Sequence, residues 1–158
     1  MPLLRSDEIK IFALAAAALL AAATPRIASA TLGEPEVSVQ TDVDRALASI
    51  KSLQEREGYR VHEIQLPSGT VMREFVATDG MVFAVTWQGP RHPDLRQALG
   101  RYFDAYVSAP RSKFADRRHM RIQQGDLIVQ ASGHMGALSG RAYLASAVPS
   151  GVSIGELH

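Results

Sequence analysis

The sequence contains no cysteine among its 158 residues. This absence excludes disulfide bonds, thiol catalysis, cysteine-ligated zinc and anchoring through a lipidated cysteine. Tryptophan is also rare, since Trp87 is the only one. A protein without covalent or metal cross-links must be stabilised by its hydrophobic core alone.

The sequence has only one long apolar run, near the N-terminus. Residues 11–23 form a stretch of 13 residues without a charge, preceded by Arg5 and Lys10. A helix needs about 20 residues to cross a bilayer, so this run is too short to span a membrane. The Ala28-Ser29-Ala30 sequence that follows fits a signal peptidase site. We therefore predict a cleavable signal peptide over 1–30, export to the bacterial periplasm or beyond, and no membrane span after cleavage. The alternative is a buried alanine-rich helix.

The chain that remains after cleavage has no excess of either charge. Removal of residues 1–30 takes away three basic and two acidic residues, which leaves 14 of each. A neutral domain lacks the positive field that nucleic-acid binding usually requires, so we expect no nucleic-acid partner. Its length suggests a single domain, which we place at 31–148, followed by a flexible tail over 149–158.

Hydrophobic spacing and capping residues predict two helices. The first is expected over 42–57, because four apolar residues step by three or four positions and Gly58 follows them. The apolar residues are Val43, Leu47, Ile50 and Leu53. The second helix is expected to begin at Pro93-Asp94, residues suited to a first helical turn, and to end before Pro110.

Strand-like runs separated by turn residues fill the rest of the chain. They cover residues 59–66, 70–77, 81–87, 119–124, 127–132 and 140–147. Glycine follows a polar residue in the early connections, which is the turn chemistry that joins antiparallel neighbours. The run 81–87 is apolar on both faces, so it should lie centrally or beneath helices. We predict an α+β fold, with two helices packed on one face of a largely antiparallel sheet of about six strands, in the order α-β-β-β-α-β-β-β.

Several sequence blocks are distinctive. They are Leu32-Gly33, GTVMREFV at 69–76, VFAVTWQGPRHPDL at 82–95, Gly133-His134-Met135 and Gly140-Arg141-Ala142-Tyr143. In this order they resemble a family of exported bacterial proteins known as domain of unknown function 2844, over most of the exported chain. Phe75 stands where this family would have tyrosine, and Gly136 where it would have a basic residue. The second departure removes the basis for an anion-binding role of that loop. The resemblance implies export, one small domain and no established activity or catalytic residue.

No local pattern indicates a metal or catalytic centre. None of the histidines is paired at the spacing of a helical zinc motif or lies near a cluster of acids. The histidines are His62, His92, His119, His134 and His158. The chain has no G-x-S-x-G motif, and its acidic residues near the strands are suited to cross-strand ion pairing. We therefore predict no metal, no cofactor and no catalytic residue that the sequence alone can name.

The corner after residues 81–87 is the most distinctive candidate for a binding site. In the functional interpretation Trp87 is a binding platform, with Arg91 and His92 as polar partners. In the structural interpretation Trp87 is a core residue, Gly89-Pro90 ends a strand and Pro93-Asp94 begins a helix. The candidate binding residues are Trp87, Arg91, His92, His134 and Arg141.

A basic segment offers a further contact surface. Residues 111–121 carry five arginine and lysine residues against one acid, Asp116. Such a segment is either a contact with anionic lipid, polysaccharide or an acidic partner, or a solvated loop. We expect a non-catalytic exported module that binds an envelope component or another secreted protein. The alternatives are a small hydrolase assembled in space around His134 or His92, and an inhibitor of another exported enzyme.

Overall fold

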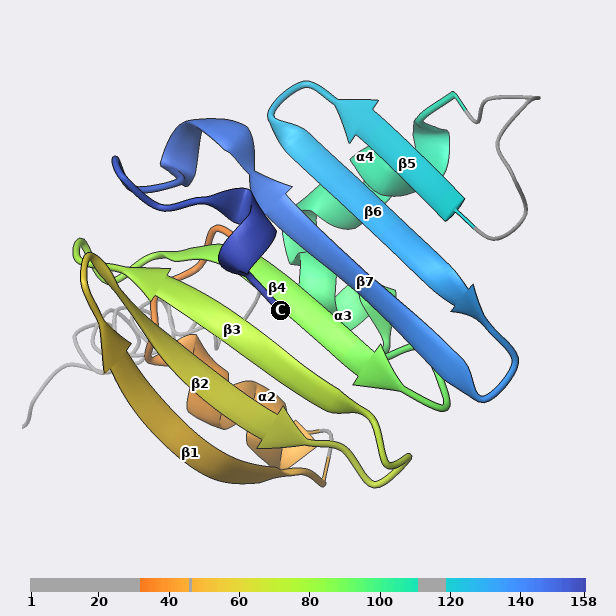
Figure 1. Ribbon diagram of the computed structural model, residues 1–158, viewed down its shortest axis with the longest axis horizontal. Coiled ribbons are helices and arrows are strands. Elements are labelled where there is room, and N and C mark those ends of the chain that lie inside the picture. The colour runs from red at the N-terminus through yellow and green to blue at the C-terminus, as the bar shows by residue number, and fades with distance from the viewer. Residues whose placement is uncertain (1–31, 46, 111–118) are drawn as a thin grey trace, which may run out of the picture.

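Seven antiparallel strands form one sheet in the order β1-β2-β3-β4-β7-β6-β5 (Figure 1). The computed structural model describes residues 32–45, 47–110 and 119–158. The strands are β1 (Ser49–Arg56), β2 (Tyr59–Gln65), β3 (Val71–Ala77), β4 (Val82–Gly89), β5 (His119–Gln124), β6 (Leu127–His134) and β7 (Ala137–Leu144). The helical elements are α2 (Ser38–Arg45), α3 (Leu95–Leu99), η1 (Gly100–Tyr102), α4 (Phe103–Ser108), η2 (Ala145–Ala147) and η3 (Ile154–Glu156). The predicted α+β class is confirmed, with seven strands where about six were expected.

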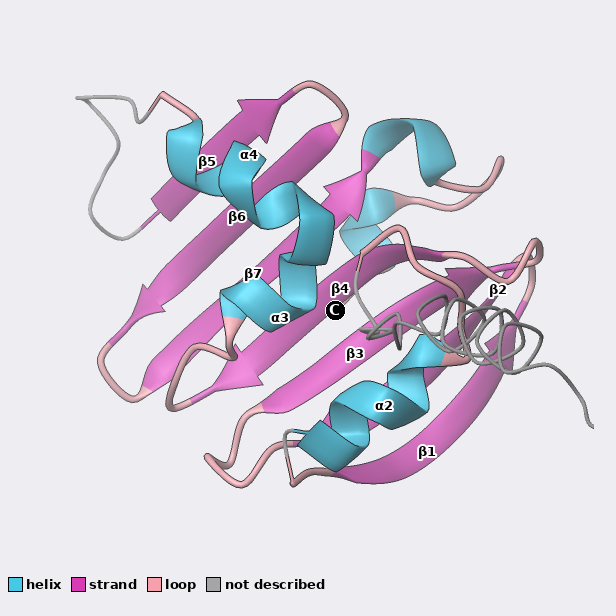
Figure 2. Ribbon diagram, turned by 180° about the vertical axis from the view of Figure 1, so that it is seen from behind, coloured by secondary structure: helices cyan, strands magenta, loops and turns pink. Residues whose placement is uncertain are grey.

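The two faces of the sheet are covered differently. Figure 2 shows α2, α3 and α4 on one face, which we call the helix face. The C-terminal segment after β7 crosses the opposite face, which we call the tail face (Figure 1). Strand β4 lies fourth of seven in the sheet, and its residues 82–87 are all buried. The predicted central position of this run is therefore confirmed.

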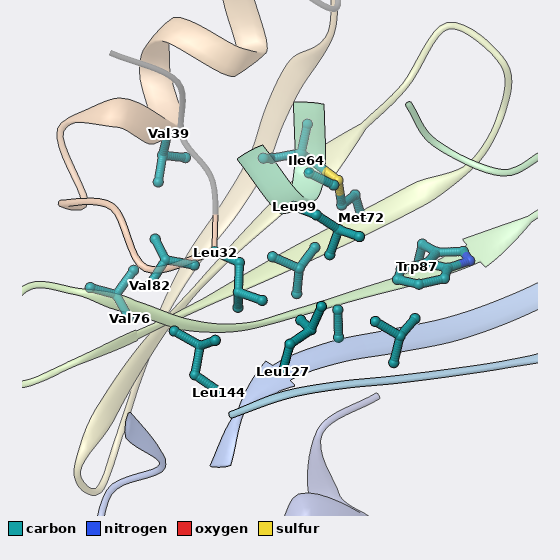
Figure 3. Packing of buried hydrophobic residues seen from close by; sticks show 14 of the residues in the cluster. Leu32, Val39, Ile64, Met72, Val76, Val82, Trp87, Leu99, Leu127 and Leu144 are labelled. Carbon is teal, nitrogen blue, oxygen red and sulfur yellow. The ribbon is translucent and has the colours of Figure 1, made fainter. Parts of the chain in front are cut away.

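The main core lies between the sheet and the helices of the helix face. Ile64 of β2, Trp87 of β4 and Leu99 of α3 belong to one buried cluster, together with Leu32 (Figure 3). The helical segment 95–108 begins one residue after the predicted start at Pro93-Asp94, because Asp94 is the N-cap and its carboxylate accepts hydrogen bonds from the backbone of the first helical turn. A 3-10 turn at Gly100–Tyr102 separates α3 from α4.

The predicted helix over 42–57 is wrong over most of its length. Helix α2 ends at Arg45, and Leu47 then has a φ of 50°, which takes the backbone out of the helix. Ile50 and Leu53 lie on β1 instead, opposite Ile64 and His62. A bulge between Ile50 and Ser52 adds one residue, so two side chains three positions apart face the same side of the strand. The bulge thus reproduces the spacing of a helical stripe.

The terminal residues 149–158, expected to form a flexible tail, pack against the tail face. Leu157 is 2% exposed and belongs to a second buried cluster with Phe75, Phe83 and Tyr143. The apolar residues Val152, Ile154 and Leu157 are spaced by two and then three positions, so they follow neither the strand nor the helix period throughout. They find their partners only because the sheet presents an apolar area beneath them. The predicted signal peptide over 1–30 and residues 111–118 of the basic segment lie outside the described residues.

Candidate functional site

Trp87 is a core residue of the helix face. Its side chain is 2% exposed, and it lies opposite Gly140 of β7. A Cβ atom on Gly140 would stand 2.2 Å from Cζ2 of the indole ring, so the ring occupies the space that a side chain would fill. The Nε1 atom is buried and has no hydrogen-bond partner among the described residues. It lies on the side of the ring turned away from Leu99 (Figure 3).

The structure brings only part of the predicted site together. The rings of Trp87 and His92 meet edge to face with their centroids 6.4 Å apart. Arg91 is exposed at the corner, and His134 is exposed at the turn between β6 and β7. Arg141 is on the tail face, because it is adjacent in β7 to the residue that faces Trp87. The five candidates therefore do not form one site.

Strand register places a line of polar residues across the tail face. Each residue lies opposite the next one on a neighbouring strand, from β2 through β3, β4, β7 and β6 to β5. We call this line the arginine row; its members are Glu63, Arg73, Thr86, Arg141, Gln130 and Arg121. Residues directly opposite each other share one face of a sheet. Six residues distant in sequence are thereby presented together.

A second polar line runs beside the arginine row, displaced from it by two residues on each of β4, β7, β6 and β5. We call it the hydroxyl row; its members are Gln88, Ser139, Ser132 and His119. On the other side of the arginine row, Ala84, Tyr143 and Ile128 form an apolar line. The C-terminal segment covers this apolar line. A depression of about 420 Å³ remains over the two polar rows, with Leu157 and His158 at its margin.

Arg141 is held in place by two neutral acceptors. Its Nε donates to Oε1 of Gln130 at 2.7 Å, and its Nη1 donates to the carbonyl oxygen of Ile154 at 2.6 Å. No carboxylate of the described residues forms an ion pair with it. The Nη2 nitrogen has no protein acceptor in the described part of the chain and is not closed off from solvent. Arg141 thus presents an oriented guanidinium with unused donors.

The other two arginines of the row differ in their charge balance. The Nε atom of Arg73 lies 2.9 Å from Oε2 of Glu63, so this positive charge is paired. Arg121 is exposed and takes part in none of the ion pairs among the described residues. Arg141 and Arg121, two of the three guanidiniums in the row, therefore have no negative partner among the described residues. Such a surface attracts anions.

Sequence reasoning selected Arg141 but neither Arg73 nor the hydroxyl row. A local pattern does mark these positions, because four strands carry polar residues at i and i+2. The pairs are Thr86 and Gln88, His119 and Arg121, Gln130 and Ser132, and Ser139 and Arg141. This alternation shows that each strand has one polar face. It does not show that the four polar faces lie side by side.

A separate polar cluster anchors the segment before α2 to the helix face. The carboxylate of Glu36 lies 2.6 Å from Nη2 of Arg60 and accepts a hydrogen bond from Nε2 of His62 at 2.7 Å. Both partners are on β2. These contacts are internal and partly buried, so we assign them a structural role.

Replacement of Glu36 by alanine should lower the free energy of unfolding by about 1–3 kcal/mol, because it leaves the half-buried His62 and Arg60 without an acceptor. Urea denaturation followed by circular dichroism measures this change. Glu34→Ala is the matched control, since the carboxylate of Glu34 lies 4.0 Å from the exposed side chain of Arg101, and such surface pairs contribute about 0–1 kcal/mol. Equal effects of the two substitutions would contradict the anchoring role.

Neither a metal-binding cluster nor a membrane-spanning helix is found among the described residues. In the three described ranges, no group of three or more acidic or histidine side chains stands close enough to hold a metal ion. None of the helices in these ranges is both long and apolar enough to cross a bilayer.

The fold and the tail face together define a small α+β protein with a polar, arginine-bearing surface on an antiparallel sheet. The chain belongs to the family described as "Protein of unknown function (DUF2844)", which matches residues 28–157. This match confirms the resemblance seen in the sequence blocks. The comparisons with curated proteins and with solved structures return no match.

Proposed function

We propose that this protein is an exported, non-catalytic binding module and that the arginine row of the tail face binds an anionic group. Export is supported by the charged start, the short apolar run and the Ala28-Ser29-Ala30 sequence. Binding is supported above all by Arg141 and Arg121, two guanidiniums with no carboxylate partner among the described residues. The anionic group would belong to a component of the cell envelope or to another secreted molecule.

The geometry of Arg141 suits recognition of a planar anion. A guanidinium can donate two parallel hydrogen bonds to one carboxylate or phosphate. Gln130 and Ile154 already hold the Arg141 side chain by its Nε and Nη1 atoms. Little side-chain freedom is therefore lost when an anion meets Nη2, which favours binding.

Arg121 extends the positive surface toward the edge of the sheet. It lies two strands from Arg141, with Gln130 between them, and this separation is about 10 Å because neighbouring strands are about 4.8 Å apart. Arg73 lies two strands away on the other side, where Glu63 neutralises it. The free positive charge is thus concentrated over β7, β6 and β5.

Substitution of Arg141 by glutamine should weaken the binding of citrate, used as a probe anion, by about tenfold or more, since a hydrogen bond to a charged group contributes about 1.5–3 kcal/mol. Arg121→Gln should have a smaller effect, because its side chain is exposed and screened. Titration calorimetry at low and at high salt measures both affinities, and affinity should fall as salt rises.

Arg101→Gln provides the matched control, because it removes the same charge from an exposed position near Gly33. It should leave citrate affinity unchanged. The proposal is wrong if Arg141→Gln and Arg101→Gln bind citrate as the unmodified protein does, or if citrate does not bind at low salt.

A further inference from the structure

We infer that the ligand of the tail face is a sugar acid, a hydroxylated ring that bears a carboxylate. This inference rests on the proposed anion site and adds the chemical class of its ligand. The observation that carries it is the hydroxyl row, which lies beside the arginine row over the same depression.

The distance between the two rows matches one sugar ring. Ser139 and Arg141 are two residues apart on β7, as Gln130 and Ser132 are on β6. Two residues along an antiparallel strand span about 7 Å. A carboxylate held by Arg141 therefore places the far side of a six-membered ring over the hydroxyl row.

The hydroxyl row has the hydrogen-bonding capacity that sugar hydroxyls require. The Oγ atoms of Ser132 and Ser139 lie 3.1 Å apart, so one hydroxyl proton is shared and the pair keeps one further donor and several lone pairs. Gln88 is exposed and its amide makes no side-chain hydrogen bond within the described residues. These groups both donate and accept, as sugar hydroxyls do. An anion without hydroxyls would use only their donors.

The lining of the depression argues against two other classes of acid. A fatty acid needs an extended groove of aliphatic side chains, but the strand residues of the tail face that line the depression belong to the two polar rows, and Leu157 is 2% exposed. A nucleotide is usually held by a base stacked on an aromatic side chain. The ring of Trp87 is buried in the core of the helix face, and the other aromatic rings of the lining are the imidazoles of His119 and His158, which offer a smaller stacking surface than an indole. A compact, polar acid fits better than either class.

Titration calorimetry of the full-length chain with single small molecules tests the ligand class. The probes are glucuronate, galacturonate, glucose, acetate and glucose 1-phosphate. A uronate should bind about tenfold or more tightly than either acetate or glucose, because it alone engages both rows. The double variant S132A/S139A should weaken uronate binding about fivefold or more and leave acetate binding unchanged, because acetate is too short to reach from Arg141 to the hydroxyl row.

The controls separate failure of the ligand class from failure of the anion site. Ser150→Ala removes an exposed hydroxyl from the tail turn and should change no affinity. If acetate binds as tightly as the uronates, or if S132A/S139A binds uronate normally while Arg141→Gln still loses citrate, the sugar-acid assignment is overturned and the anion site stands. Tighter binding of glucose 1-phosphate than of both uronates overturns the assignment of a carboxylate. If Arg141→Gln has no effect on any anion, both proposals fail.

Discussion

Replacement of Gly140 by alanine is expected to lower the free energy of unfolding by about 3 kcal/mol, at the upper end of what overpacking costs in a well-packed core. The new Cβ atom would stand 2.2 Å from Cζ2 and 2.5 Å from Cε2 of the Trp87 ring, and 2.9 Å from the carbonyl oxygen of Gln130. The ring is buried and the carbonyl belongs to the neighbouring strand, so neither can move away freely. Urea denaturation followed by far-ultraviolet circular dichroism measures the loss.

Two further variants test whether contact with the Trp87 ring causes this loss of stability. Gly155→Ala is the matched control, because a Cβ atom there would meet only Oγ of Ser153 at 3.5 Å; it should change the stability by less than about 0.5 kcal/mol. Trp87→Leu removes the ring, so Gly140→Ala should cost at least about 1 kcal/mol less in that background. Strictly additive effects would contradict the proposed contact between Trp87 and position 140.

Replacement of Leu157 by alanine should cost about 2–5 kcal/mol, the range for a buried leucine. Leu157 is 2% exposed and packs in the cluster of Phe75, Phe83 and Tyr143, although it lies next to the last residue of the sequence. Leu53→Ala is the matched control, since Leu53 is 54% exposed on β1; it should cost less than about 0.5 kcal/mol. Denaturant unfolding of both variants measures the difference.

Leu157→Ala should also weaken anion binding at the arginine row. Arg141 donates to the carbonyl oxygen of Ile154, three residues before Leu157. Loss of the Leu157 contacts loosens this segment, so the affinity of Leu157→Ala for citrate should fall several-fold. If Leu157→Ala unfolds at the same urea concentration as Leu53→Ala, the C-terminal segment does not pack on the tail face.

Turn residues and hydrophobic runs were sufficient to predict most of the strands. Gly69 and Gly80 each have a φ above 80° in the turns that flank β3, as the glycine-containing turns indicated. The run 82–87 is apolar at nearly every position, which predicted a strand buried on both faces. Such features depend on each segment's own residues, so they can be recognised without knowledge of the rest of the chain.

The first predicted helix failed because one periodicity has two structural explanations. Ile50 and Leu53 are three residues apart, which fits a helix face. On β1 the bulge after Ile50 gives the same result, because the additional residue restores both side chains to one side. A bulge is stabilised by the strand on which it pairs, here β2. The residues of β1 alone could not distinguish the two.

The sequence by itself determined the elements with strong local signatures, namely the central strand, the capped helix that begins after Asp94 and the polar alternation on each strand of the tail face. Only the tertiary structure decided that β7 pairs with β4, which places Arg141 opposite Thr86 on the tail face and Gly140 beneath Trp87 on the helix face. Pairing between strands about fifty residues apart depends on burial of both faces at once, and a shift of one residue would exchange the faces. The candidate site is a property of that register.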